Sequence, residues 1–414
     1  MSVDSAPFSW RGGLDGIATK RYLFVHVLFE RAKGMNATRA SAVGPRRGPA
    51  AIAARILPRE RRRGRGASTN VSGRFEIQAR EDFDDGWTRE EAPEPLSTEV
   101  TIERPRSVIT RNDSPDIPFD RSINPYRGCE HGCFYCFARP THAFMGLSAG
   151  LDFETRLFAK ERAAELLERE LAAAKYVPAP IAFGTNTDPY QPIERQYRIT
   201  RSLLETLRRV RHPLSIVTKS NLILRDLDIL SDMGRDGLVK VFLSVTTLDR
   251  ELARKMEPRA PTPQKRLEAI EALNDAGVPA GVMVAPIIPA INDSEIERIL
   301  TRAYAAGARE GGYVVLRLPL EIRDMFREWL QVHYPDRLNH AVSLIQSMHG
   351  GKDYESQWGR RMAGSGPYAW MIGRRFEMAA RRLGYRETKT TLRTDLFRKP
   401  KPATKEAGAQ LTLF

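Results

Sequence analysis

From Ser122 to about residue 320, short apolar segments alternate with segments whose apolar residues repeat at helical spacing. The short segments have the length and the β-branched content of buried strands. Strands that alternate with helices usually form a parallel sheet whose outer face the helices cover. The sequence therefore predicts an α/β fold with six strand–helix units. We expect the first strand to end near Arg127 and the others at 178–187, 214–218, 239–246, 279–286 and 313–318, with helices at 154–176, 200–210, 222–233, 264–276 and 294–306.

The rest of the chain divides by composition into four segments. Residues 1–63 are basic, rich in Arg, Ala and Gly, and show no strand or helix period, so we expect them to be disordered. Residues 64–121 are polar, and we expect them to wrap over the core α/β domain at 122–320. Residues 321–398 show helical spacing, and residues 399–414 have the composition of a flexible linker with a short apolar tail. The helices expected in the fourth quarter of the chain are 323–333, 340–348 and about 362–383.

Three cysteines, Cys129, Cys133 and Cys136, lie within eight consecutive positions, and the sequence has no other cysteine. Cysteine thiolates bind iron well because both partners are soft. A cluster of four irons normally has four cysteine ligands. With three ligands, one iron stays open to water or to a substrate, so the spacing C-x-x-x-C-x-x-C predicts an iron–sulfur cluster with one open position.

Two other interpretations of the cysteines stay open. They could be buried apolar residues in a reducing cytoplasm. They could also form an incomplete zinc site, with His131 or His142 as the fourth ligand. Gly128 and Gly132 allow the backbone to fold tightly around a bulky group, which favours the iron–sulfur interpretation.

The cysteine motif resembles that of the radical S-adenosylmethionine (SAM) superfamily, including the aromatic Tyr135 before the last cysteine. The flanking segment 123–128 (INPYRG) and the downstream segment 187–194 (TDPYQPIE) are similar to the branch that contains spore photoproduct lyase and DNA-repair-photolyase-like proteins. The likeness extends from about Gly64 to about Arg398. It implies an incomplete (β/α)6 TIM-like barrel, a [4Fe–4S] cluster held by the three cysteines, and SAM bound at the open iron. It also implies an electron donor such as flavodoxin or ferredoxin, and cleavage of SAM to a 5′-deoxyadenosyl radical.

The same resemblance assigns the SAM contacts to Tyr135, Thr187, Lys219 and Ser244. The last three follow or end predicted parallel strands, and loops at the carboxyl ends of such strands converge on one mouth. Lys219 could pair with the SAM carboxylate, and Thr187 with its neighbouring carboxylate could hold the ammonium group. The alternative for each residue is an ordinary strand-end cap.

Three arginines are candidates for the substrate side of the site, namely Arg259, Arg266 and Arg317. Arg317 lies among apolar residues and therefore needs a partner. A structural ion pair is the more frequent explanation for such an arginine. No catalytic residue is predicted, and the histidines are interpreted as structural or surface groups.

The sequence departs from spore photoproduct lyases at two points. Those enzymes hold a cysteine outside the cluster that returns a hydrogen atom to the product radical, whereas the matching segment here is 185–187 (TNT). They also carry a tyrosine directly after the third cluster cysteine, where this chain has Phe137. A hydroxyl or amide cannot replace the thiol because its bond to hydrogen is too strong. We therefore do not expect thymine-dimer lyase chemistry by that route.

Charge is distributed unevenly along the chain, whose net charge is +14. Residues 1–65 carry a net charge of +10 and residues 351–414 of +8, whereas the middle is net −4. Basic ends of this kind suit phosphate backbones, although solvated tails would look the same. No run of 18 apolar residues occurs, so we expect no transmembrane helix. The small number of cysteines and an oxygen-sensitive cluster both point to the cytoplasm.

The last five residues, 410–414, resemble the peptide by which bacterial DNA polymerases and repair proteins dock on the sliding clamp. In that resemblance Leu413 and Phe414 would fill an apolar pocket, Leu411 a second subsite, and Gln410 would hydrogen-bond at the edge. We therefore predict a radical SAM enzyme that acts on DNA in repair or lesion processing. The alternatives are a radical SAM enzyme that modifies RNA, protein or a small metabolite, and a non-catalytic iron–sulfur protein associated with DNA.

Overall fold

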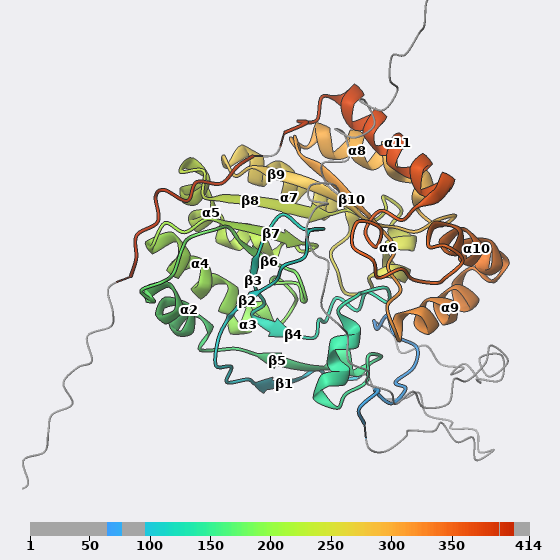
Figure 1. The fold of residues 1–414 in the computed structure, drawn as a ribbon, viewed down its shortest axis with the longest axis horizontal. Coiled ribbons are helices and arrows are strands. Elements are labelled where there is room, and N and C mark those ends of the chain that lie inside the picture. Colours follow the sequence, from blue (N-terminus) through green and yellow to red (C-terminus); the bar gives the residue numbers. More distant parts are fainter. Residues whose placement is uncertain (1–63, 77–95, 389, 401–414) are drawn as a thin grey trace, which may run out of the picture.

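A computed structural model describes residues 64–76, 96–388 and 390–400. The segment expected to be disordered and the clamp-like peptide lie outside these residues. Six parallel strands follow one another in chain order across a single sheet, and β2 adds to one edge in the antiparallel direction (Figure 1). This arrangement confirms the predicted α/β fold of a partial barrel. The order is β10 (Gly311–Val315), β9 (Ala280–Ile287), β8 (Val239–Ser244), β7 (Leu214–Thr218), β6 (Ile181–Phe183), β3 (Arg121–Ile123) and β2 (Ile109–Arg111).

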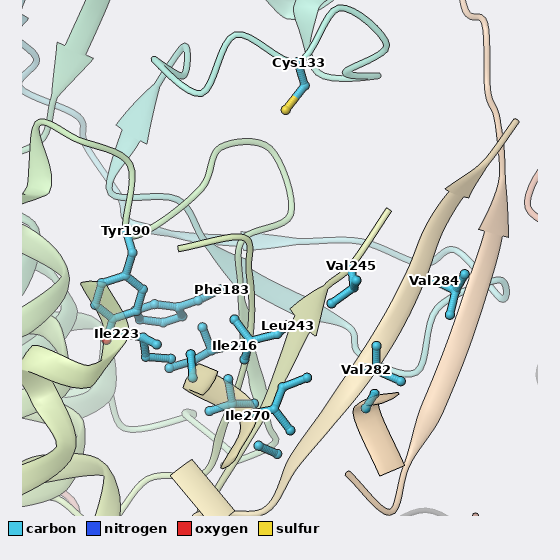
Figure 2. Close-up of a cluster of buried hydrophobic side chains, with 14 of the residues drawn as sticks. Cys133, Phe183, Tyr190, Ile216, Ile223, Leu243, Val245, Ile270, Val282 and Val284 are labelled. Carbon is cyan, nitrogen blue, oxygen red and sulfur yellow. The ribbon is translucent and has the colours of Figure 1, made fainter. Parts of the chain in front are cut away.

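Helices cover the outer face of this sheet, as the alternating pattern predicts. In α4 the buried residues Leu203, Leu204 and Leu207 recur at helical spacing and face the core. Inside, buried strand residues such as Ile216, Leu243 and Val282 pack together (Figure 2). The main helices of this layer are α2 (Ala163–Ala172), α4 (Ile199–Arg209), α5 (Leu227–Arg235), α6 (Arg250–Met256), α7 (Pro263–Asp275) and α8 (Ile296–Ala305), and the short elements between them are α3 (Glu194–Tyr197), η4 (Asn221–Asp226) and η5 (Asp293–Glu295).

The predicted helix 154–176 is wrong in its first part. Its residues form α1 (Asp152–Thr155), then strand β5 (Arg156–Ala159), and only then α2. β5 pairs with β1 (Glu99–Ile102) and β4 (Tyr126–Arg127) in a second sheet of three strands. A short apolar run such as Leu157-Phe158 is compatible with a helix and with a strand. The strand forms here because β1, more than fifty residues earlier in the chain, pairs with it.

The segment after the barrel is helical, with α9 (Ile322–His333), α10 (Leu338–Met348) and α11 (Gly366–Leu383). α11 packs against α8, and the chain then returns along the barrel in an extended form (Figure 1). There Arg393 N–H donates to the Gly237 carbonyl at 3.0 Å, and Phe397 packs against Tyr176 and His212. Among the described helices, none combines the length and apolar character needed to cross a bilayer.

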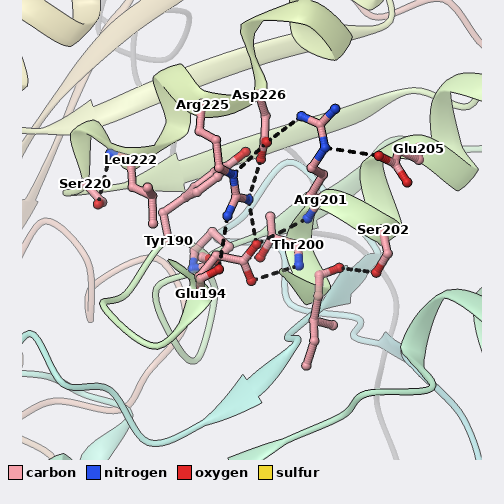
Figure 3. A network of polar contacts seen from close by, with 12 residues as sticks. Tyr190, Glu194, Thr200, Arg201, Ser202, Glu205, Ser220, Leu222, Arg225 and Asp226 are labelled. Carbon is pink, nitrogen blue, oxygen red and sulfur yellow. Dashed lines mark hydrogen bonds and ion pairs between the residues drawn. The ribbon is translucent and has the colours of Figure 1, made fainter. Parts of the chain in front are cut away.

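A buried polar network ties the start of α4 to the neighbouring loops (Figure 3). The fully buried Glu194 carboxylate accepts hydrogen bonds from Thr200 N–H at 3.0 Å and from Arg225 at 2.7 Å. The buried Asp226 accepts from both Arg225 and Arg201. Because every buried charge here has a partner, this part of the barrel is held rigidly.

Candidate active site

The three cysteines lie on the loop between β4 and η3 (Arg139–Met145), at the carboxyl ends of the parallel strands. Figure 2 shows Cys133 above the core with its sulfur directed toward the strand ends. Gly128 and Gly132 both have positive φ, at 74° and 68°, which only glycine adopts without strain. A Cβ on Gly66 would lie 1.6 Å from the Gly132 carbonyl oxygen, so the earlier segment of the chain also presses directly on the loop.

A buried ion pair supports the cysteine loop from behind. The Arg139 guanidinium donates to the Cys133 carbonyl at 2.8 Å and to the Gly150 carbonyl at 2.9 Å, and it pairs with the Glu154 carboxylate. Glu154 also accepts from the backbone N–H groups of Gly66 and Ala67. One buried salt bridge therefore joins three segments of the chain around Cys133. The sequence offered no signal for Arg139, because its role depends entirely on contacts made in the fold.

The cysteine thiols are close together and mostly removed from water. Cys129 and Cys133 are buried, and Cys136 is partly buried. Burial raises the pKa of Cys129 well above its usual value, and the neighbouring Asp188 raises it further. Burial likewise raises the pKa of Cys133 to about 12, although nearby Lys219 acts in the opposite direction. Three thiolates at this place therefore require positive charge among them, which a metal centre supplies.

The geometry fits a cluster better than a single metal ion. Within the described residues, no three His, Cys, Asp or Glu side chains are close enough to hold one ion. Each thiolate of an iron–sulfur cluster binds a different iron, so wider spacing suits a cluster. The two histidines of the zinc alternative have other partners: His131 Nδ1 lies 3.4 Å from Asp188, and His142 Nε2 lies 3.0 Å from the Arg156 carbonyl oxygen. The zinc interpretation is therefore disfavoured.

Two of the four predicted SAM contacts present polar groups that make no side-chain hydrogen bond or salt bridge in the described part of the chain. Lys219 follows β7, and its ammonium lies 5.8 Å from the centre of the Tyr135 ring with no carboxylate in salt-bridge range. Burial acts to lower the pKa of Lys219, but Cys133 and Glu257 outweigh it and raise the pKa. Ser244 ends β8, and its hydroxyl makes no hydrogen bond there. Both groups are available to a bound carboxylate.

The other two predicted contacts already hold the loop in place. The Thr187 hydroxyl donates to the Gly128 carbonyl at 2.6 Å and accepts from Gln191 Nε2 at 3.1 Å. The Tyr135 hydroxyl donates to the Glu257 carboxylate, and the Tyr135 ring is buried. These side chains determine the position of the cysteine loop, whatever further contact they make.

The Asp188 carboxylate is also engaged in hydrogen bonds within the protein. Its carboxylate accepts hydrogen bonds from the Thr218 hydroxyl at 2.6 Å and the Lys219 N–H at 2.8 Å. Burial would raise the pKa of Asp188, but His131 and these donors lower it to about 2. The carboxylate thus links the ends of β6 and β7 to the cysteine loop, and it has little capacity left for a SAM ammonium.

Glu257 is the residue that sequence reasoning missed. Its buried carboxylate accepts from Tyr135, from the Thr246 hydroxyl at 3.0 Å and from Arg266. Burial raises its pKa, but Arg266 and Lys219 together lower it below the usual value. Its position in the sequence could have indicated it, because Glu257 lies in the segment after β8, two residues before Arg259.

The three candidate arginines have different surroundings. Arg266 is buried and paired with Glu257, so it is a structural residue and not a substrate contact. Arg259 pairs with Glu130 of the cysteine loop at 3.0 Å. The predicted strand 313–318 included Arg317, but β10 ends at Val315, so Arg317 lies beyond it and forms no ion pair within the described residues. The structural ion pair expected for Arg317 is therefore wrong, because its partners are aromatic rings and a sulfur atom.

Comparison with known proteins places this site in a family. Residues 123–303 match the model of the radical SAM superfamily. An uncharacterized protein of Mycobacterium tuberculosis is 39% identical over 232 residues, covering 56% of this chain and 68% of that protein. An uncharacterized protein of Methanocaldococcus jannaschii is 28% identical over 214 residues, covering 52% of this chain and 76% of that protein.

Solved structures of spore photoproduct lyase have a similar fold at low identity. A mutant of that enzyme aligns with a TM-score of 0.46 and 17% identity, covering 69% of this chain and 77% of that chain. Another mutant, with bound AdoMet and dinucleoside spore photoproduct, aligns with a TM-score of 0.45 and the same 17% identity. The family match requires a [4Fe–4S] cluster and SAM, and three buried or partly buried thiols beside a lysine without a salt bridge in the described residues fit both. The chain belongs to the radical SAM superfamily and is a radical SAM enzyme.

Proposed function

We propose that this enzyme acts on DNA, in repair or lesion processing. The proposal rests on the charge distribution along the sequence. Residues 1–65 carry a net charge of +10 and residues 351–414 of +8, whereas residues 66–350 carry −4. A surface that binds a phosphate backbone needs such a concentration of positive charge. When bound, the cofactors supply a 5′-deoxyadenosyl radical, formed as one electron from a reductant cleaves the C5′–S bond of SAM to leave methionine.

We further propose that Lys219 and Ser244 bind the SAM carboxylate. The Lys219 ammonium has no salt-bridge partner among the described residues, so its N–H donors are available to the carboxylate of a bound ligand. Ser244 ends the neighbouring strand and has a hydroxyl to donate. Tyr135 and Thr187 contribute by holding the loop that carries the cysteines. This division separates the residues that touch SAM from those that position the cluster ligands.

SAM cleavage and DNA modification can be tested separately. Reconstituted protein with SAM and dithionite should produce 5′-deoxyadenosine. Duplex or damaged DNA with deuterium in its sugars and bases should then transfer deuterium into 5′-deoxyadenosine. SAM cleavage without any transfer from DNA, but with transfer from labelled RNA, protein or metabolite extracts, would contradict the DNA proposal and leave the superfamily assignment intact.

The predicted partners lead to two further experiments. Deleting residues 410–414 should abolish binding to a bacterial sliding clamp, and clamp binding that is absent or equal with both forms would refute that link. Reduced flavodoxin or ferredoxin should replace dithionite in the SAM cleavage assay, as expected of a protein that works in a reducing cytoplasm. Failure of both carriers, while dithionite still supports cleavage, would exclude them as electron donors.

A further inference from the structure

Arg317 is a cation at the barrel mouth for which the described part of the chain provides no anion. It follows β10 at the carboxyl end of the sheet, where the cysteine loop also lies. Its guanidinium lies 5.0 Å from the centre of the Phe137 ring, and Phe137 directly follows Cys136. A large apolar ring next to a cluster ligand would normally be buried, but Phe137 is 46% exposed. Arg317 is itself partly exposed, so a ligand can reach both side chains.

The guanidinium is held in position while part of its hydrogen-bonding capacity stays unused. One terminal nitrogen of Arg317 donates to the Tyr354 hydroxyl at 3.2 Å, and the other contacts the Met362 sulfur at 3.7 Å. The Nε atom is buried and has no hydrogen-bond partner among the described residues. A guanidinium has five N–H donors, so each terminal nitrogen keeps one N–H for a ligand. Two such donors side by side match the oxygens of a phosphate or carboxylate.

The loop that carries Tyr354 and Met362 is anchored on both sides of Arg317. The Val315 N–H donates to the Met362 carbonyl at 2.9 Å, and Asp353 accepts from Arg327 at 2.7 Å. Farther along the loop, the Gly359 N–H donates to Asp116 at 2.6 Å. These anchors reduce the entropy that Arg317 would lose on binding an anion. A surface arginine that only stacks on a ring would not require them.

We assign the SAM carboxylate and the anion on Arg317 to different groups. Lys219 follows β7 and Arg317 follows β10, which are separated by β8 and β9. Three steps between neighbouring strands separate the two backbone positions by about 14 Å. The two cations also lie over different rings, Lys219 over Tyr135 and Arg317 over Phe137. With Lys219 assigned to SAM, Arg317 is left for the substrate.

We propose that Arg317 binds a phosphodiester of the DNA substrate and so places the adjoining nucleoside beside the cysteine loop. This inference rests on the proposed function, because a phosphodiester is the anion that a DNA substrate offers at every nucleotide. The exposed face of Phe137 gives the adjoining base a ring on which to stack. Arg317 is thus a substrate-binding residue that determines which nucleoside lies closest to the cluster.

The test compares the reconstituted enzyme's binding of the dinucleotide dTpdA with that of its methylphosphonate analogue, in the presence of SAM. The two probes differ by one negative charge at the phosphorus atom. The unmodified protein should bind the phosphodiester about tenfold more tightly, as expected for a charged hydrogen-bonded pair. Arg317→Gln should reduce this preference to less than about twofold, and Arg317→Lys should keep part of it because the charge remains but the paired donors do not.

The matched control is Arg298→Gln, which removes an equally charged but exposed side chain from α8 and should leave the preference unchanged. Iron content and circular dichroism of Arg317→Gln should match the unmodified protein, whereas loss of a purely structural arginine would lower both. Equal phosphodiester preference in Arg317→Gln and the unmodified protein would overturn the proposal, as would the absence of any preference in the unmodified protein. A preference that depends on Arg317, without deuterium transfer from DNA, would instead refute the proposed function and leave an anion site.

Discussion

Replacing Arg139 with methionine is the sharpest test of how the fold holds the cysteine loop. Arg139 and Glu154 are both fully buried, and the guanidinium also donates to the carbonyl groups of Cys133, Ala149 and Gly150. Methionine fills much of the same volume but donates no hydrogen bond. The Arg139→Met variant therefore leaves a buried carboxylate without its counter-ion and removes a donor from three carbonyl groups, of which Cys133 keeps the Cys136 N–H.

Breaking a buried pair from one side typically costs about 3–5 kcal/mol of unfolding free energy. Three carbonyl groups that lose this donor add to this cost, although the Gly66 and Ala67 N–H groups continue to stabilise Glu154. We expect the unfolding free energy to fall by about 4 kcal/mol, a large part of the roughly 5–15 kcal/mol available to a domain. Because the lost contacts surround Cys133, iron content after reconstitution should fall more steeply than helix content.

Urea unfolding followed by circular dichroism measures the stability change, and iron and sulfide analysis measures the cluster. The matched control is Arg162→Met, which removes an exposed pair with Glu165 whose side chains are 68% and 61% accessible. It should change the stability by less than about 0.5 kcal/mol. A double replacement, Arg139→Met with Glu154→Leu, should be less destabilising than the sum of the single changes. An Arg139→Met protein with full iron content and a loss below about 1 kcal/mol would refute this account of the loop.

Three other replacements test the SAM site, a buried histidine and the glycine contact. Lys219→Met should weaken SAM binding by about tenfold or more, measured by equilibrium binding to reconstituted protein, with unchanged iron content. Burial lowers the pKa of His212 to about 4, so as the pH falls the unfolded chain binds a proton at His212 at a higher pH than the folded protein does. Stability should therefore fall by about 3 kcal/mol as the pH drops from about 6.5 to 4, and His212→Gln should reduce this fall in urea titrations. Gly66→Ala should lower iron content sharply, because its Cβ would overlap the Gly132 carbonyl.

The controls for these three changes come from the same structure. Lys219→Arg should restore part of the SAM affinity, and unchanged affinity in Lys219→Met would exclude the proposed carboxylate contact. A pH dependence that is the same with and without His212 would show that other groups dominate acid unfolding. Gly311→Ala should be tolerated, because a Cβ there meets its neighbours at an ordinary 3.5 Å; equal iron loss in both glycine variants would contradict the contact argument.

Local patterns were sufficient for elements whose partners are near in sequence. Strands β7, β8 and β9 and helices α4 and α7 lie within about two residues of their predicted bounds, because strand–helix units bury one consistent apolar face. The segment beginning at Glu154 was wrong because β5 pairs with β1, and no local period carries that information. Likewise, the predicted strand 178–187 shortens to Ile181–Phe183, since its polar end forms the site.

The same contrast holds for the site. The spacing of three cysteines and the strand-end positions of Lys219 and Ser244 are visible in the sequence, because metal ligands on one loop and groups at parallel strand ends must converge. The buried partners Arg139 and Glu257 are not visible, because their charges are tolerated only where distant segments supply counter-charges.

The sequence by itself determined the parallel α/β architecture, the cysteine ligands and the absence of a fourth cysteine. Only the tertiary structure decided which polar groups at the mouth are already satisfied and which are free. Thr187 and Asp188 are used within the protein, whereas Lys219 and Arg317 face the site without a carboxylate partner in the described chain. Hydrogen bonding depends on distances of about 3 Å between atoms, and residues far apart in the chain reach such distances only through the fold.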